Sequence, residues 1–248
     1  MILASDFIEE GKRRNFLLYS GVPCSYLKPF INYVIDSDDI EYIGAANEGE
    51  AIAVAAGASL SGTNSVVMFQ NSGLGNAVNP FTSLIQTFEI PILMIATLRG
   101  DPENDPDEPQ HQLMGKITTQ LLDLMQVSWS WFPENDDELI KAMATIKDRI
   151  LDRQQPHVLV MKKNSVAPFD LSKKSESSIN HIATVDDCKN EASGLVSRSE
   201  VIEVLIEKTN EEDDLIIATT GYTGRVLYAA GDRNNHFYMV GSMGCAID

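Results

Sequence analysis

Two glutamates, Glu48 and Glu50, stand near the start of the segment 45–57, which reads AANEGEAIAVAAG. The segment is predicted to be a helix, and carboxylates in a first helical turn interact favourably with the positive end of the helix dipole. A strand-like segment, 40–44, leads directly into it, so Glu48 stands where a strand ends and a helix begins. Ligands of open α/β sheets bind at such an edge. Glu48 is therefore a candidate ligand-binding carboxylate, although both glutamates also fit a solvated turn in which they only complement the dipole.

Four further stretches combine glycine with polar side chains where strands are predicted to end. They are QNSGLGN (70–76), the polar loop 98–115 that contains His111, TTGYTG (219–224) and GSMG (241–244). Backbone N–H groups at a strand-to-helix turn can bind an anionic ligand. Taken singly, each stretch also has an ordinary structural explanation, because glycine-rich turns are common in α/β proteins and a histidine in a polar loop is commonly solvated.

Strands alternate with helices as far as residue 162, and the inner strands are nearly continuous apolar runs. This pattern predicts an α/β fold in which a parallel sheet has helices on both faces. The predicted strands are 16–20, 40–44, 65–70, 91–97, 128–132 and 157–162. The predicted helices are 5–15, 25–36, 47–60, 116–125 and 136–152, with one more opened by NSGLGN.

A polar segment rich in serine, lysine and asparagine separates this pattern from a second one. Residues 1–165 are predicted to form the first domain and residues 166–196 a linker. A second α/β pattern follows, with helices 198–208 and 225–230 and strands 214–219 and 236–240. Residues 197–248 are near the lower size at which a domain folds alone, so they are expected to be the incomplete start of a second α/β domain.

The formal net charge of −17 disfavours nucleic acid and anionic membranes as partners. It does not disfavour a small anionic substrate, because such a site needs only local positive charge. No apolar run is long enough to cross a bilayer, and charges occupy the N-terminus where a signal peptide needs an apolar stretch. Cys24, Cys188 and Cys245 are odd in number and far apart, which argues against a disulfide framework or a zinc site. A cytoplasmic protein is expected.

The motifs become specific when they are taken together, in this order and at these spacings. The chain resembles the thiamine-diphosphate-dependent 2-oxoacid decarboxylases through GVP (21–23), NEGEA (47–51), QNSGLGNAVNP (70–80), RG (99–100) with DEPQH (107–111), ATTG (218–221) and FYMVGSMGCA (237–246). The resemblance implies a carboxy-lyase with the thiamine-diphosphate-binding fold. NEGEA and DEPQH favour the branch that converts 3-phosphonopyruvate to phosphonoacetaldehyde and CO₂. Sulfopyruvate as the substrate and a catalytically silent truncated protein remain alternatives.

The resemblance implies that residues 1–165 hold the aminopyrimidine of thiamine diphosphate. The family's N-E glutamate hydrogen-bonds the ring nitrogen N1′, and Glu48 matches that glutamate. A proton shared with N1′ favours the tautomer whose exocyclic nitrogen deprotonates the thiazolium, and the thiazolium then takes up the electron pair left when CO₂ departs. Gly73 is implied to contact the cofactor. Gln70 and Asn71 are implied to shape the pocket wall, and Gln70 to bind substrate.

The same resemblance assigns residues that face the substrate. His111 falls where the family keeps active-site histidines, which implies substrate binding or a protonation after CO₂ has left. A phosphonate needs cations, and Arg99 is the first candidate because its planar fork suits phosphonate oxygens. Lys116 and Lys28 are weaker candidates. Family members often carry an acidic residue just after GVP, where this chain has Cys24, so an acid-assisted step is not transferred to this site.

By the resemblance, residues 197–248 correspond to the start of the diphosphate-binding domain. The implied cofactor-binding residues are Thr220, Gly221, Gly241, Ser242 and Met243. The loop of Thr220 and Gly221 would touch the diphosphate. The Gly241 carbonyl would accept a hydrogen bond from the exocyclic amine, and Met243 would be the apolar wedge that bends the cofactor.

In this family Mg²⁺ bridges the diphosphate to a Gly-Asp-Gly motif and to an asparagine further along the chain. No Gly-Asp-Gly occurs in the sequence, so no metal ligand is assigned here and the ligands of Mg²⁺ are expected outside this chain. The family also builds its site between two chains. The expected partners are therefore a small anionic 2-oxoacid and either further copies of this chain or a separate chain that supplies the rest of the diphosphate-binding domain.

Overall fold

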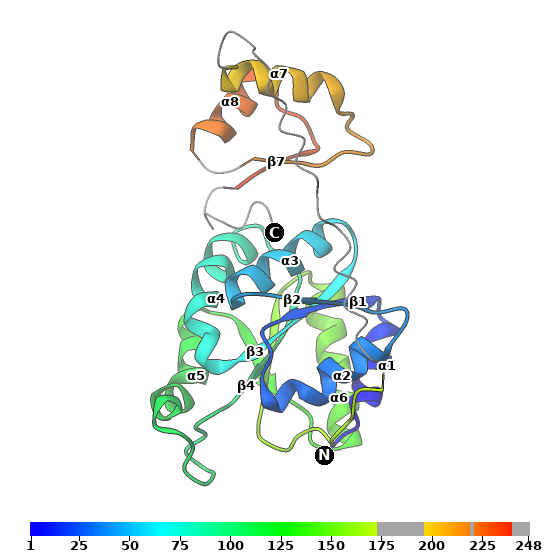
Figure 1. The fold of residues 1–248 in the computed structure, drawn as a ribbon, viewed down its shortest axis with the longest axis vertical. Coiled ribbons are helices and arrows are strands. Elements are labelled where there is room, and N and C mark those ends of the chain that lie inside the picture. Colours follow the sequence, from blue (N-terminus) through cyan, green and yellow to red (C-terminus); the bar gives the residue numbers. More distant parts are fainter. Residues whose placement is uncertain (173–195, 219–220, 240–248) are drawn as a thin grey trace. The chain divides into compact units, whose positions relative to one another are not determined.

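The computed structural model describes residues 1–172, 196–218 and 221–239. The chain divides into two units, of which the first contains Met1–Ser172, and the described residues of the second are 196–218 and 221–239. Figure 1 shows the elements of both units. Within those ranges, no helix combines the length and the apolar composition that crossing a bilayer requires.

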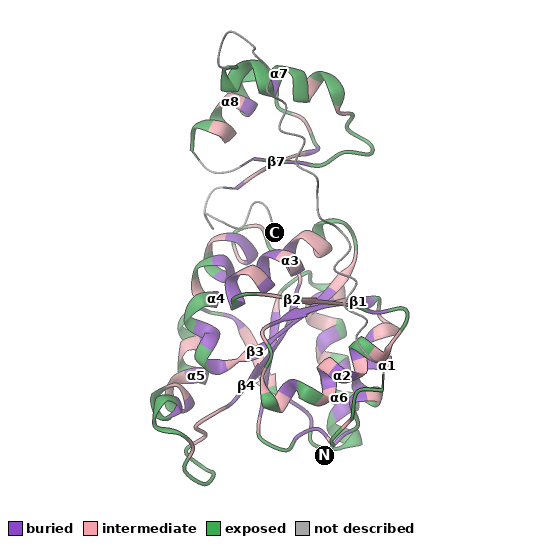
Figure 2. Cartoon of the chain, in the orientation of Figure 1, coloured by how far each residue is buried: buried purple, intermediate pink, exposed green. Residues whose placement is uncertain are grey.

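The first unit is built on a six-stranded sheet with the strand order β2-β1-β3-β4-β6-β5. The strands are β1 (Phe16–Gly21), β2 (Glu41–Gly44), β3 (Asn64–Gln70), β4 (Leu93–Thr97), β5 (Ser128–Trp131) and β6 (His157–Met161). Every pair of neighbouring strands is parallel. β4 and β6 are buried along their whole length, and the purple of buried residues runs through the middle of the sheet in Figure 2. The predicted parallel sheet is confirmed, and its buried strands explain the continuous apolar runs.

Helices cover both faces of this sheet, as predicted. They are α1 (Ala4–Lys12), α2 (Lys28–Asp36), α3 (Glu48–Leu60), α4 (Leu74–Pro80), α5 (Gln112–Leu124) and α6 (Asp136–Ile146). Phe7, Phe30 and Met143, from α1, α2 and α6, pack in one apolar cluster with the strand residues Met68 and Ile95. In Figure 1, α3, α4 and α5 lie on the opposite side of the sheet.

Single turns of other helix types join these elements. Turns of 3₁₀-helix, Ser25–Leu27, Asn71–Gly73 and Pro109–His111, lead into α2, α4 and α5. Turns of π-helix, Phe81–Ile85 and Lys147–Asp152, follow α4 and α6. The predicted helix 136–152 is therefore present, with a wider final turn.

The predicted polar loop 98–115 is too long, because α5 begins at Gln112 and not at residue 116. The first turn of α5 exposes most of its side chains, including Leu113 at 65%, so its composition is that of a loop. Its packing depends instead on Gly115, where an added Cβ would lie 1.7 Å from the carbonyl oxygen of Gly100. Backbone therefore meets backbone here, and no apolar periodicity marks the contact.

The second unit has the order helix, strand, helix, strand. Its elements are α7 (Arg198–Lys208), β7 (Ile216–Ala218), α8 (Tyr222–Ala230) and β8 (His236–Tyr238), and the two strands are parallel. α7 begins with a capping box between Ser197 and Glu200. The small core contains Ile202, Ile216 and Leu227. The second α/β pattern is therefore observed, while the domain boundaries at residues 165 and 196 stay predictions.

Candidate active site

The candidate residues follow the carboxyl ends of neighbouring strands. Cys24 follows β1, Glu48 follows β2, and Asn71 and Arg99 follow β3 and β4. Because parallel strands place their carboxyl ends at one edge of the sheet, these residues gather there.

The two glutamates of α3 have different surroundings. Asn47 caps the helix, since its Oδ1 accepts hydrogen bonds from the backbone N–H groups of Gly49 (2.8 Å) and Glu50 (3.1 Å). Glu50 turns back and its Oε2 accepts from the N–H of Ala46 at 2.6 Å. Glu48 is buried, with 8% of its surface exposed. The solvated-turn interpretation therefore suits Glu50 and does not describe Glu48.

The segment that follows β3, from Gly73 into α4, holds the Glu48 carboxylate. The side-chain Nδ2 of Asn76 donates a hydrogen bond to Glu48 Oε2 at 2.8 Å. A Cβ added at Gly73 would lie 1.9 Å from Oε1 of the same carboxylate. Gly73 and Asn76 are three residues apart, so one helical turn presents both to Glu48. Gly73 is among the residues predicted from the sequence, whereas Asn76 is not, although it stands in the same motif, SGLGN (72–76).

The side chain of Asn71 cross-links the segments at the carboxyl edge of the sheet. It is completely buried, and its Nδ2 donates to the carbonyl oxygen of Arg99 and to Oγ1 of Thr118, each at 3.0 Å. Its Oδ1 accepts from the backbone N–H of Arg99 at 3.1 Å. All three polar positions of this side chain are used between protein groups, so Asn71 supports the pocket by joining β3, β4 and α5.

Gln70 lies in a polar group that spans three strands. Its Nε2 donates to Ser72 Oγ at 2.6 Å, and its Oε1 accepts from the Cys24 thiol at 3.4 Å. The Cys24 sulfur is also 3.5 Å from Oγ1 of the buried Thr97. The thiol that stands in place of the family's acidic residue is therefore a hydrogen-bonding neighbour of Gln70.

Arg99 is paired within its own loop. Its Nε and Nη2 donate to the two carboxylate oxygens of Asp107, each at 2.6 Å, and its guanidinium lies 5.2 Å from the ring centre of Tyr26. These hydrogen bonds hold the pKa of Asp107 well below its usual range. A phosphonate that binds Arg99 must share this guanidinium with Asp107, so the substrate role of Arg99 stays a prediction.

The Arg99–Asp107 pair is expected to hold the loop 101–107 in place. Charged hydrogen bonds contribute about 1.5–3 kcal/mol each, so Asp107→Asn is expected to speed amide hydrogen exchange in this loop by roughly 10- to 100-fold. Because the pKa of Asp107 is lowered by folding, its contribution is present above the ordinary aspartate pKa of about 4 and declines gradually as the pH falls towards the much lower folded pKa, so part of it is lost by pH 3. The measurement is hydrogen exchange between pH 3 and pH 7.

Asp105→Asn is the matched control, because Asp105 is an exposed carboxylate of the same loop. It is expected to change exchange by less than about threefold, since exposed charges contribute little. Equal exchange in Asp107→Asn and in the unaltered protein would show that the ion pair does not order this loop.

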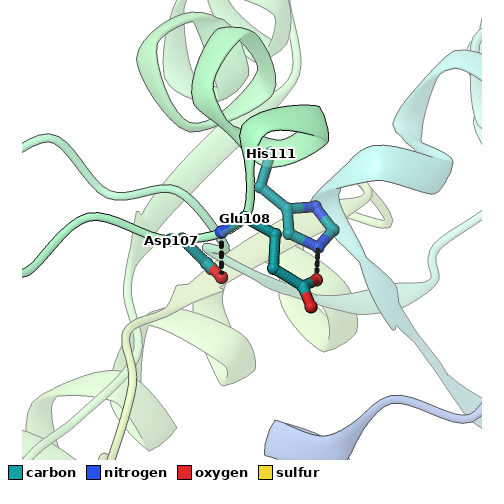
Figure 3. Close-up of side chains that lie close together, drawn as sticks. All are labelled: Asp107, Glu108 and His111. Carbon is teal, nitrogen blue, oxygen red and sulfur yellow. Dashed lines mark hydrogen bonds and ion pairs between the residues drawn. The ribbon is translucent and has the colours of Figure 1, made fainter.

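His111 is buried, with 7% of its surface exposed, and ends the turn Pro109–His111. Its Nε2 lies 3.3 Å from Oε2 of Glu108, as Figure 3 shows, and its buried Nδ1 has no hydrogen-bond partner among the described residues. The loop closes on it tightly, because a Cβ at Gly100 would lie 2.2 Å from the His111 carbonyl oxygen. The solvated histidine of the alternative interpretation is not observed, and a catalytic role stays a prediction.

Asp107, Glu108 and His111 also bring potential metal-ligand atoms within 4.8 Å of one another. The carboxylate of Asp107 is already bound by Arg99 and by the N–H groups of Gly100 and Glu108. A divalent cation would compete with that guanidinium, so this group does not fit a Mg²⁺ site.

The remaining predicted residues lie elsewhere on the first unit, in the second unit, or outside the described residues. Gly221 immediately precedes α8 with a φ of 90°, which suits glycine, and it is exposed. Lys28 and Lys116 are exposed, on α2 and α5 respectively. Thr220, Gly241, Ser242 and Met243 lie outside the described residues.

Comparison with known proteins connects this edge to a family. The phosphonopyruvate decarboxylase of Streptomyces viridochromogenes is 39% identical over 246 residues, which cover 99% of this chain. The chain spans 62% of the length of that relative. The sulfopyruvate decarboxylase subunit alpha of Methanococcus maripaludis is 34% identical over 143 residues, which cover 57% of this chain and 83% of that protein.

A solved structure and a family model match as well. The benzoylformate decarboxylase of Polynucleobacter necessarius superposes with a TM-score of 0.53 at 18% identity, over 88% of this chain and 38% of that one, and so shows the fold. Residues 6–123 match the family described as "Thiamine pyrophosphate enzyme, N-terminal TPP binding domain", a range that contains Glu48, Gly73 and His111. The chain therefore belongs to the thiamine pyrophosphate enzyme family.

Proposed function

We propose that this chain is part of a thiamine-diphosphate-dependent carboxy-lyase that converts 3-phosphonopyruvate to phosphonoacetaldehyde and CO₂. The observation that carries the proposal is the buried carboxylate of Glu48, held by Gly73 and Asn76 at the carboxyl edge of the sheet. The substrate is proposed from similarity over 99% of the chain to a relative named phosphonopyruvate decarboxylase. Because this chain spans 62% of that relative, the activity belongs to an assembly that includes further residues.

The described residues fit the aminopyrimidine end of the cofactor. When bound, thiamine diphosphate supplies a thiazolium that takes up the electron pair left by CO₂. Glu48 would hold a proton between its carboxyl group and ring nitrogen N1′. Gly73, which has no side chain, leaves room for that carboxyl group. His111 would exchange a proton with the substrate or bind it, and Gln70 would form part of the wall next to Cys24.

The diphosphate end needs more than the described residues supply. We propose that Thr220 and Gly221 contact the diphosphate, while Gly241, Ser242 and Met243 contact the aminopyrimidine side of the cofactor and its bend. The ligands of Mg²⁺ would come from outside this chain. Residues that cover β7 would come from the same source, since Ile217 in this strand is 40% exposed although parallel strands are ordinarily covered on both faces. A homo-oligomer or a second kind of chain would complete the site.

A second candidate substrate is sulfopyruvate. It is favoured by the similarity to a protein named as a subunit of sulfopyruvate decarboxylase, which this chain covers to 83% of its length. Sulfonate and phosphonate are both tetrahedral anions, so the exposed and paired cations of this edge do not separate them. The phosphonate is preferred because the first relative matches 99% of this chain.

The test is a decarboxylation assay of the assembly that contains this chain and the residues that complete the diphosphate-binding domain. Thiamine diphosphate and Mg²⁺ are added, and 3-phosphonopyruvate, sulfopyruvate and pyruvate are compared in parallel. A higher kcat/KM for 3-phosphonopyruvate than for sulfopyruvate or pyruvate is expected, with the larger difference for pyruvate, which lacks the second anionic group. A preference for sulfopyruvate would replace the substrate. Binding of neither cofactor nor 2-oxoacid would favour a silent protein and contradict the proposal.

A further inference from the structure

Among the described residues, one side chain, that of Asn76, donates a hydrogen bond to the carboxylate of Glu48. Asn76 Nδ2 donates to Oε2 at 2.8 Å, and the backbone of Gly73 lies against Oε1. Both residues come from the segment that follows β3, whereas Glu48 begins α3. The two segments are 28 residues apart between Glu48 and Asn76, so the contact depends on the folded sheet edge.

Several features separate this contact from ordinary packing. Asn76 is exposed, so its side chain fills no part of the core, while Glu48 is 8% exposed. Truncating Asn76 would therefore leave no cavity but would remove the hydrogen bond to Oε2. An amide also donates without adding a charge, so it orients the carboxyl group and does not neutralise it as lysine or arginine would.

We propose that Asn76 is a positioning residue for Glu48, whose carboxyl group it orients for proton sharing with the aminopyrimidine of thiamine diphosphate. The contact between Asn76 and Glu48 is given by the described hydrogen bond. Its effect on proton sharing with the cofactor rests on the proposed function. A carboxyl group free to rotate would lose part of its alignment with the ring nitrogen, because catalytic groups must be held near the productive geometry.

The experiment is a double-mutant cycle with Asn76→Ala and Glu48→Ala. The quantity measured is the Kd of thiamine diphosphate, with Mg²⁺, for the assembly that contains this chain and the rest of the diphosphate-binding domain. Asn76→Ala is expected to weaken binding by roughly 10- to 100-fold when Glu48 is present, as for loss of a charged hydrogen bond. In the Glu48→Ala background the same change is expected to matter by less than about twofold. An equal loss in both backgrounds would identify a purely structural role and overturn the proposal.

Asn79→Ala is the matched control, because Asn79 lies on the same helix and its side-chain oxygen accepts from Ser83 at 3.1 Å. It is expected to leave the Kd within about twofold. A loss as large as that of Asn76→Ala would show that any asparagine removed from α4 weakens binding.

A second measurement needs no cofactor. The carboxyl ¹³C resonance of Glu48, assigned by its absence in Glu48→Gln, is expected to shift in Asn76→Ala and to stay in place in Asn79→Ala. An unchanged resonance in Asn76→Ala would overturn the proposal even where binding is too weak to measure. A shifted resonance in a protein that binds no thiamine diphosphate would instead contradict the proposed function and leave the contact between the two side chains established.

Discussion

Glu48→Gln is expected to lower the rate of decarboxylation by roughly 10²- to 10⁴-fold, the range over which a positioned acid or base contributes. Glutamine keeps the size of the side chain and can still accept the hydrogen bond from Asn76, but it cannot hold a proton for the ring nitrogen. The buried position makes the loss difficult to replace, because little water reaches a side chain that is 8% exposed. The measurement is single-turnover decarboxylation of 3-phosphonopyruvate at saturating cofactor.

The matched control is Glu50→Gln, in the same helical turn. The Oε2 of Glu50 accepts from the backbone N–H of Ala46 at 2.6 Å, a capping contact away from the Glu48 carboxylate. Glutamine keeps an oxygen that can accept this hydrogen bond, so the change is expected to cost less than about 0.5 kcal/mol of stability and to leave the rate within a few-fold. Equal rates in Glu48→Gln and in the unaltered protein would remove Glu48 from the reaction.

The parallel sheet is predictable because each of its inner strands is an apolar run that can only be buried on both faces. β4 and β6, which are buried along their whole length, carry the clearest signal. Glu48 is predictable for a related reason. A carboxylate directly after a strand and at the start of an apolar helix must lie at the carboxyl edge of a parallel sheet.

Other parts of the site depend on contacts that periodicity does not record. The burial of His111 follows from the close approach of Gly100 and Gly115, which have no side chains to mark it. The pairing of Arg99 with Asp107 requires a loop whose path is set by its own hydrogen bonds. Local patterns describe faces of helices and strands, whereas these contacts arise between loops.

Gly73→Ala is expected to destabilise the first unit by roughly 1–3 kcal/mol, the usual cost of inserting a methyl group into a packed site. The new Cβ would lie 1.9 Å from Oε1 and 2.0 Å from Cδ of Glu48, so either the carboxyl group or the turn must move. Backbone strain does not contribute, because Gly73 has a φ of −81° and a ψ of −6°, which alanine adopts readily. The measurement is the free energy of unfolding in urea, together with the Kd of thiamine diphosphate.

Gly75→Ala supplies a control of the opposite sign. A Cβ at Gly75 meets no heavy atom within 4 Å, and the residue lies inside α4. Alanine is the better helix former, so this variant is expected to be more stable by about 0.5–1 kcal/mol. A similar destabilisation in both variants would show that the turn rejects any side chain, and would remove the special relation between Gly73 and Glu48.

The decisive variant combines Gly73→Ala with Glu48→Ala. If the alanine methyl group clashes with the Glu48 carboxyl group, shortening Glu48 removes the atoms that lie 1.9, 2.0 and 2.5 Å from the new Cβ. The Gly73→Ala change is then expected to cost less than about 0.5 kcal/mol in the Glu48→Ala background, since coupled neighbours are non-additive. An undiminished cost would place the clash elsewhere. If Gly73→Ala costs little stability in the Glu48→Ala background while cofactor binding stays lost, the clash is with the Glu48 carboxyl group. Position 73 must then be glycine so that this carboxyl group can stay where it is.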